Sequence, residues 1–360
     1  MKKTVLILLV ITLLTNVSVH AQHGFINPEL QKFAREALIN GIDGFDNVNQ
    51  ACAVVMDTST GKVIADVCVR PYDNTYLDIP NGNAMAMPSA IGRAVIYLGL
   101  MGEGVSPESS WDCGEGIYTD SISGCTITDH LAYRHGGYGE ISLKNSLNVS
   151  DIGIYKAVEH TFGRDMGRYA SAIRKTGILF EDCNDSEDDY GGYYGIWNPC
   201  DILGYSSKFS HYQQAAWVNM VANGGKLLLR VSESESKQAL CVVKNEAGLD
   251  SLRSAMLDIV ENGTGTSLRS VYTLSAGFVN ATPPDGENNR LCFAAAFFPY
   301  DHPLYTVSVF VSKKRPASRG IPLKTTKDII EYIAKNYILE YGAAEKDLKI
   351  HPAEKGVDTY

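Results

Sequence analysis

The strongest constraint on the fold is that two β-rich hairpins stand at opposite ends of the chain. Near the N-terminus, residues 51–57 and 62–69 are rich in β-branched side chains and flank the turn sequence Thr58-Ser59-Thr60-Gly61. Near the C-terminus, residues 291–298 and 305–312 form a second pair of strong strands. The intervening chain has mainly helical spacing. We therefore predict an α+β domain whose sheet joins the two extremes of the chain.

The helical segments are bounded by ordinary start and stop signals. Pro88 opens an apolar stretch that Gly102 and Gly104 end. Residues 71–86 are polar with Asn, Gly and Pro and are predicted to form a loop, and residues 180–205 form an acidic insert rich in Gly and Tyr. The remaining predicted helices cover residues 31–42, 142–162, 164–176, 212–223, 248–262 and 325–337.

The N-terminus has the three-part pattern of a secretory signal peptide. Lys2 and Lys3 precede an apolar run, and Val19-His20-Ala21 ends it with residues that a signal peptidase accepts. We expect a signal peptide over 1–21, a leader helix over 22–44, one domain over 45–340 and a polar tail over 341–360. Removing 1–21 takes away two lysines and no acidic residue, so the net charge falls from -9 to -11. We expect no nucleic-acid partner and no transmembrane span in the mature chain.

Eight cysteines in an exported chain favour disulfides over metal ligation. No CxxC pair and no Cys/His cluster with zinc spacing is found, and four histidines at 130, 135, 160 and 211 share no ligand spacing, so we expect neither a metal nor a cofactor. Free buried thiols remain the alternative, because connectivity does not follow from sequence. The candidate pairs are Cys52 with Cys68, Cys113 with Cys125, and Cys183 with Cys200.

Several stretches, in one order along the chain, resemble the transpeptidase domain of penicillin-binding proteins, which shares the serine acyl-transferase fold of the serine β-lactamases. The resemblance spans about residues 45–340 and implies an antiparallel sheet flanked by helices, with an inserted helical region. Val221-Ala222-Asn223-Gly224-Gly225 and Val260-Glu261-Asn262-Gly263-Thr264-Gly265 are similar to two family landmarks. The other similar stretches are residues 53–57 with 60–65, 88–104, 142–163, and 276–277 with 293–299.

The resemblance implies a first catalytic motif, S-x-x-K, on the helix that begins near Pro88. Its spacing puts serine and lysine on one helix face, so that the amine takes the hydroxyl proton. The alignment that fits the helix length places Ala90 at the nucleophile and Arg93 at the base. The other alignment makes Ser89 the nucleophile and Gly92 the base. Arginine stays protonated and glycine has no side chain, so neither alignment supplies a base.

The other two motifs also lack a required group. The S-x-N motif falls at Ser150-Asp151-Ile152, where Ile152 replaces the asparagine amide. The K-T/S-G motif falls at Phe278-Val279-Asn280, where Phe278 replaces the cation that would hold the substrate carboxylate. The decoy Lys175-Thr176-Gly177 lies at a helix end, far before the strand.

Three degenerate motifs predict a catalytically inactive, periplasmic or secreted protein that binds a peptidoglycan fragment or an envelope protein. Arg93 is the ligand-binding candidate, because a guanidinium can fix a carboxylate by two hydrogen bonds. The alternative for Arg93 is pairing with a neighbouring acid or exposure to solvent. Two other functions stay open, namely an active acyl-serine transpeptidase with Ser89 as nucleophile and a disulfide-stapled structural scaffold.

Overall fold

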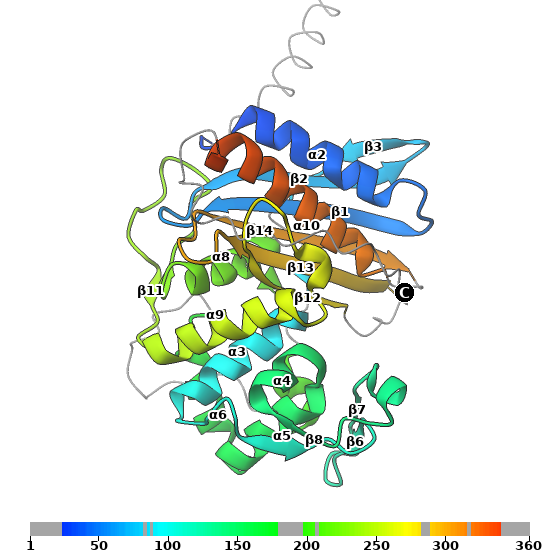
Figure 1. Cartoon of the computed structure of the whole chain (residues 1–360), viewed down its shortest axis with the longest axis vertical. Helices are drawn as coiled ribbons and strands as arrows, with labels where there is room; N and C mark the ends of the chain where they lie inside the picture. Colours follow the sequence, from blue (N-terminus) through cyan, green and yellow to red (C-terminus); the bar gives the residue numbers. More distant parts are fainter. Residues whose placement is uncertain are drawn as a thin grey trace, which may run out of the picture.

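A six-stranded antiparallel sheet joins the two ends of the chain (Figure 1), as the sequence predicted. The computed structural model describes residues 24–81, 85–86, 89–178, 197–205, 209–281, 289–314 and 318–339. The strand order is β12-β13-β14-β1-β2-β3, and Val54 of β1 lies opposite Ser308 of β14. The strands are β1 (Val48–Asp57), β2 (Val63–Tyr72), β3 (Thr75–Asp78), β12 (Ala276–Ala281), β13 (Asn289–Phe298) and β14 (Tyr305–Lys314).

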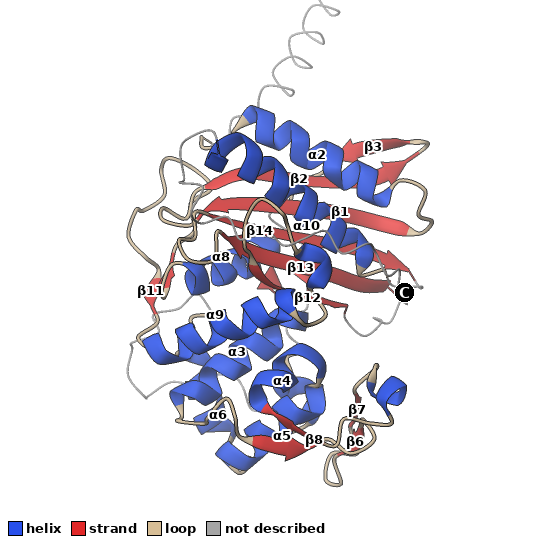
Figure 2. Ribbon diagram, in the orientation of Figure 1, coloured by secondary structure: helices blue, strands red, loops and turns tan. Residues whose placement is uncertain are grey.

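The central strand β1 is apolar and buried from Ala51 to Met56, because helices cover both faces of the sheet (Figure 2). Ala53 and Val55 face the core formed with α2 (Pro28–Ile42) and α10 (Gly320–Ile333). Val54 and Met56 point to the opposite core, which the remaining helices share. A strand covered on both sides has a continuous run of apolar residues instead of alternating apolar and polar ones. The sequence of β1 shows such a continuous run.

The second face of the sheet carries the helical region that holds the candidate site. Its centre is α8 (His211–Ala222), in which Trp217 and Met220 are fully buried. This region also contains α3 (Ser89–Gly102), α4 (Leu143–Val149), α5 (Asp151–Phe162), α6 (Met166–Arg174), α7 (Pro199–Ile202) and α9 (Glu246–Glu261). The remaining elements of the described chain are β4 (Met85–Ala86), β5 (Ser110–Asp112), β6 (Ile117–Thr119), β7 (Thr126–Thr128), β8 (Glu140–Ser142), β9 (Phe209–Ser210), β10 (Lys226–Leu227), β11 (Cys241–Val242), the 3-10 turns Ala132–His135 and Thr266–Leu268, and the π-helical turn Ala334–Leu339.

The expected loop over residues 71–86 contains an additional strand. β3 pairs with β2 across a tight turn in which Asp73 and Asn74 both have positive φ, 42° and 62°. Asp and Asn tolerate the left-handed region that such a hairpin turn requires. The Asp-Asn pair is therefore a hairpin signal, which the composition of the segment concealed.

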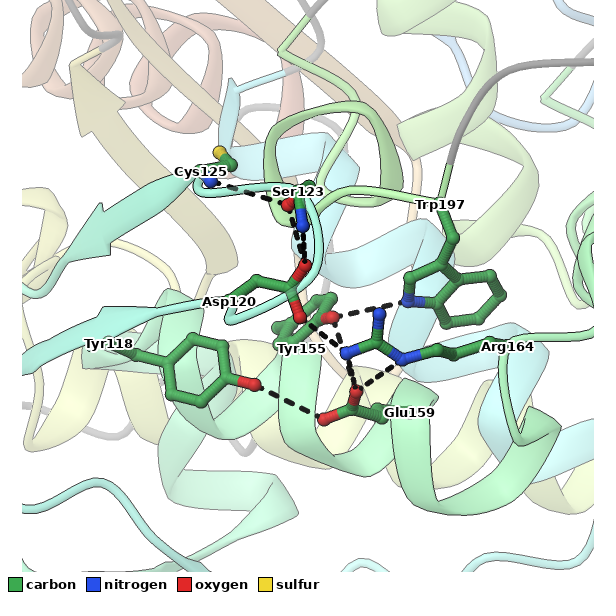
Figure 3. A network of polar contacts seen from close by, with 8 residues as sticks. All are labelled: Tyr118, Asp120, Ser123, Cys125, Tyr155, Glu159, Arg164 and Trp197. Atoms are coloured by element: carbon green, nitrogen blue, oxygen red, sulfur yellow. Dashed lines mark hydrogen bonds and ion pairs between the residues drawn. The ribbon is translucent and has the colours of Figure 1, made fainter.

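The hairpin of β6 and β7 is fixed to α5 by buried charge (Figure 3). Asp120, fully buried after β6, accepts hydrogen bonds from the Ser123 backbone N–H and hydroxyl at 2.7 and 2.6 Å. Its other oxygen pairs with Arg164, which also pairs with Glu159 of α5. These bonds hold the pKa of Asp120 at about 2, against the opposing effect of burial.

Cys52 and Cys68 form a disulfide, as the hairpin geometry predicted. They lie directly opposite each other in β1 and β2, with Cα atoms 4.0 Å apart. Among the residues that the structure describes, no helix has the length and apolar character needed to cross a bilayer. In the same residues, no group of three or more His, Cys, Asp and Glu side chains is placed to share a metal ion.

The predicted pairing of Cys113 with Cys125 is not formed. Cys113 is buried beneath the start of α5, where its sulfur lies 3.4 Å from the Ser150 hydroxyl. The β6–β7 turn directs Cys125 elsewhere, so that its thiol contacts the thiol of Cys200 on α7. Burial, followed by this contact, raises the pKa of Cys200 to about 12. Cys183, the predicted partner of Cys200, lies outside the described residues.

Candidate functional site

Arg93, which the preferred alignment places at the base of the first motif, is buried on α3. Only 8% of the residue is exposed, so it does not reach solvent. Its Nε lies 3.5 Å from Oδ1 of Asp151, which is an ion pair across two helices. Ser89 and Ala90 occupy the first turn of α3, and their side chains lie outside the described residues. The base position thus holds a guanidinium paired with an acid, the arrangement given above as the alternative to ligand binding.

Ser150, the serine of the second motif, is a helix-capping residue. The expected single helix over residues 142–162 is divided at Ser150, which has extended φ and ψ (-128° and 116°) between α4 and α5. Its hydroxyl accepts from the Gly153 N–H at 2.8 Å and lies 2.5 Å from Oδ2 of Asp129. Ile152 is fully buried in the core. Neither residue offers a polar group to a substrate. The Ser150 hydroxyl is already hydrogen-bonded within the protein, and the Ile152 side chain is apolar.

Asp129 is a member of the site that the sequence did not reveal. Its Oδ1 accepts from the backbone N–H groups of Asp151 and Ile152 at 2.8 and 3.3 Å, at the start of α5. Burial raises its pKa to about 6, and the charge of Asp151 adds to the increase against the effect of the hydrogen bonds. A lone aspartate in a polar segment carries no sequence signal for this role.

Replacing Asp129 with asparagine is expected to change the pH dependence of the free energy of unfolding. The pKa of Asp129 is raised in the folded state, so the stability from its proton is present below about pH 4 and is lost as pH rises through about 6. The wild type should lose on the order of 2 kcal/mol relative to Asp129→Asn over this interval. Urea denaturation at several pH values measures the difference. Exposed Glu115 provides the control, and parallel curves for wild type and Asp129→Asn would contradict the assignment.

Tyr205 completes a chain of polar contacts through Asp151. Its hydroxyl donates to Oδ2 of Asp151, whose Oδ1 faces Arg93. Burial, together with the neighbouring carboxylate, raises the pKa of Tyr205 above its usual range, so the phenol stays protonated. Asp151 is therefore held between a neutral donor and a cation, and Arg93 is held in place by that carboxylate.

Phe278, which the alignment places at the cation of the third motif, is a core side chain on β12, an edge strand of the sheet. It is 2% exposed and packs with the residues of α3 in the core beneath the sheet. Val279 points into the opposite core, and the side chain of Asn280 lies outside the described residues. The decoy Lys175 lies after α6, in a turn whose Thr176 carbonyl accepts from the Trp217 indole at 2.9 Å. The position that would hold a carboxylate is filled with hydrocarbon.

A contact between a serine and a histidine lies in the core and has a structural role. His211 is fully buried, its Nδ1 is 3.0 Å from Asn81 Oδ1, and its Nε2 is 2.9 Å from the Ser308 hydroxyl. Because the amide oxygen can only accept, Nδ1 carries the proton and Nε2 accepts from the serine. Burial lowers the pKa of His211 to about 3. Ser308 is also fully buried, so no substrate reaches this pair.

No family model and no curated protein matches the sequence. Among solved structures, the apo transpeptidase domain of Burkholderia pseudomallei penicillin-binding protein 3 is similar, with a TM-score of 0.67, 16% identity, and coverage of 88% of this chain and 98% of that one. A peptidoglycan glycosyltransferase from Burkholderia ambifaria is similar with a TM-score of 0.65, 16% identity, and coverage of 87% and 97%. The chain has the fold of the penicillin-binding protein transpeptidase domain, as the resemblance implied.

Proposed function

We propose that the protein is a cell-envelope protein in which a transpeptidase-type domain is catalytically inactive and acts by binding a peptidoglycan fragment or a protein partner. The observation that carries the proposal is the state of Arg93. An acyl-serine reaction needs a group that accepts a proton from the nucleophile. A guanidinium stays protonated throughout the physiological range, and this one is already paired with Asp151.

The other motif positions support the same conclusion. Phe278 is uncharged and buried, so it supplies no electrostatic contact to a substrate carboxylate. Ile152 is also buried and has no amide. A site that lacks base, amide and cation has lost the groups for proton transfer and for orientation of the substrate. The disulfide between Cys52 and Cys68, together with the signal-like N-terminus, supports export to the periplasm or beyond.

Incubation of the mature protein with a labelled penicillin, followed by intact-mass measurement, tests the loss of catalysis. We expect no adduct, while an active penicillin-binding transpeptidase domain treated in parallel is labelled. Near-ultraviolet circular dichroism establishes that the unlabelled protein is folded. An adduct that disappears in Ser89→Ala would instead establish an active enzyme with Ser89 as nucleophile.

Binding is tested separately by passing solubilised cell wall over the immobilised protein. Retention of muropeptides supports recognition of peptidoglycan. If neither muropeptides nor envelope proteins are retained, the structural scaffold held together by disulfides is the function that remains.

A further inference from the structure

We propose that Cys125 and Cys200 form a second disulfide in the exported protein, and that this bond positions Tyr205 at the candidate site. The inference rests on the proposed function in one respect, because the bond needs an oxidising compartment to form. Cys125 directly precedes β7, and Cys200 is the second residue of α7. Neither cysteine is then bonded to the partner expected from the sequence, which was Cys113 for Cys125 and Cys183 for Cys200.

The two cysteines meet where β7 packs against α7. These two elements are in contact, and Ile127 of β7 and Ile202 of α7 are buried in the same core. The thiols of Cys125 and Cys200 contact each other, and the structure records both as free thiols. A small approach of the two sulfur atoms is therefore sufficient for a bond, without repacking of β7 against α7.

Both segments that carry these cysteines are held on α5, so their meeting does not depend on a flexible side chain (Figure 3). On one side, the Cys125 carbonyl accepts from the Asp120 N–H at 2.9 Å, and Asp120 pairs with Arg164. On the other side, the Trp197 indole donates to the Tyr155 hydroxyl of α5 at 3.1 Å and anchors the segment that leads into α7. The β6–β7 hairpin and α7 are thus positioned by the same helix.

Solvent reaches Cys125 and Cys200, which are both half-buried. The other cysteines among the described residues are buried, namely Cys52, Cys68, Cys113, Cys241 and Cys292. In the reaction, the thiolate of one cysteine attacks one sulfur of an external disulfide and releases the other sulfur as a thiol. The second cysteine then loses its proton and displaces the attached sulfur as a second thiol. Two cysteine thiols are oxidised, and their two electrons and two protons reduce the external disulfide.

The bond has a consequence for the candidate site, because α7 continues into Tyr205. The Tyr205 N–H donates to the Cys200 carbonyl at 2.9 Å, which closes the turn after α7. The Tyr205 hydroxyl donates to Asp151, and Asp151 pairs with Arg93. Cys200 is therefore one hydrogen bond away from the polar contacts that hold the buried guanidinium. A covalent link at Cys200 would fix the turn and, with it, the position of the phenol.

Peptide mapping tests the pairing directly. The reduced mature protein is reoxidised in a glutathione redox buffer, the remaining thiols are alkylated at acidic pH, and the chain is cleaved before its aspartates. The four cysteines at issue then lie in separate peptides, namely 112–119 for Cys113, 120–128 for Cys125, 182–184 for Cys183 and 189–200 for Cys200. We expect the peptides of Cys125 and Cys200 to be recovered as one species, which a reductant separates.

Hydrogen exchange of the backbone amides tests the positioning of Tyr205. Cys125→Ser and Cys200→Ser prevent the bond, and Cys292→Ser provides the control, because it removes a buried cysteine of β13. In the first two variants, we expect the exchange rate of residues 203–205 to rise at least tenfold more than that of the β1 amides, relative to the oxidised wild type. The control should exchange like the wild type in residues 203–205. Near-ultraviolet circular dichroism identifies any variant that fails to fold.

The outcomes separate this proposal from the proposed function. A Cys200 peptide linked to Cys183 or Cys113, or recovered only in alkylated form, overturns the disulfide. Equal changes of exchange in residues 203–205 and in β1, or no change in either, overturn the positioning of Tyr205. Retention of muropeptides without a penicillin adduct would then leave the proposed function intact. A penicillin adduct would overturn the catalytic inactivity and leave the peptide map as a separate result.

Discussion

Replacing Asp120 with asparagine is expected to lower the free energy of unfolding by about 3–5 kcal/mol, the usual effect of breaking a buried ion pair on one side. Asp120 is fully buried, and all its described partners donate hydrogen bonds: Arg164 and both polar groups of Ser123. In the asparagine variant, the side-chain NH2 group would face one of these donor groups, so that one hydrogen bond would be lost. Equilibrium denaturation by urea at neutral pH measures the loss.

Glu159 provides the matched control, because it binds the same guanidinium from a more exposed position. Its side chain is 29% exposed, against 0% for Asp120. Glu159→Gln should therefore reduce stability by less than about 1 kcal/mol. Equal losses in the two variants would contradict the larger effect that we assign to the buried charge of Asp120.

Acidification is expected to destabilise the protein through His211. The pKa of this residue is lowered to about 3 by burial, so the stability it contributes is present above pH 6.5 and is lost as pH falls toward 3. This shift in pKa corresponds to a loss of at most about 5 kcal/mol in the free energy of unfolding. His211→Gln retains a donor and an acceptor without titrating, so wild type should lose stability relative to this variant between pH 7 and pH 4.

Two further measurements isolate this effect. His302 is exposed, and His302→Gln should therefore leave the pH profile of the wild type unchanged. The imidazole carbon resonances of His211 report its protonation directly and should stay those of the neutral ring down to about pH 4. A protonated ring at pH 6 in the folded protein would refute the assignment, whatever the stability of the glutamine variant.

The sheet was predictable because its signal is local and strong. Each of the four strands expected at the chain ends contains a run of apolar residues, and β1, β13 and β14 are buried over most of that run. The strand β3 was missed because it is exposed and short. Its only sequence signal is the turn at Asp73 and Asn74. The break at Ser150 was missed because the apolar spacing continues across it, and a serine inside a helical pattern marks a cap only when its partners are known.

The candidate site could be predicted only in part. Alignment placed Arg93, Ser150 and Phe278, and the loss of their chemistry follows from the residue types alone. Their partners did not follow, because Asp129 lies 21 residues before Ser150 and Tyr205 lies 54 residues after Asp151. A polar contact between such positions depends on how helices pack, and single-sequence patterns carry no information on that packing.

The pairing of β1 with β14 has a consequence for how the chain reaches its folded state. β2 follows β1 after a short turn, but β14, the neighbour of β1 on its other side, begins about 250 residues later. Contacts of such large sequence separation require closure of a long loop before they contribute, which slows folding. Until β14 arrives, β1 offers an open, apolar edge that can pair with another chain. Completion of the sheet must therefore wait until β14 (Tyr305–Lys314) has emerged, and a holding chaperone would bind the first hairpin in the meantime.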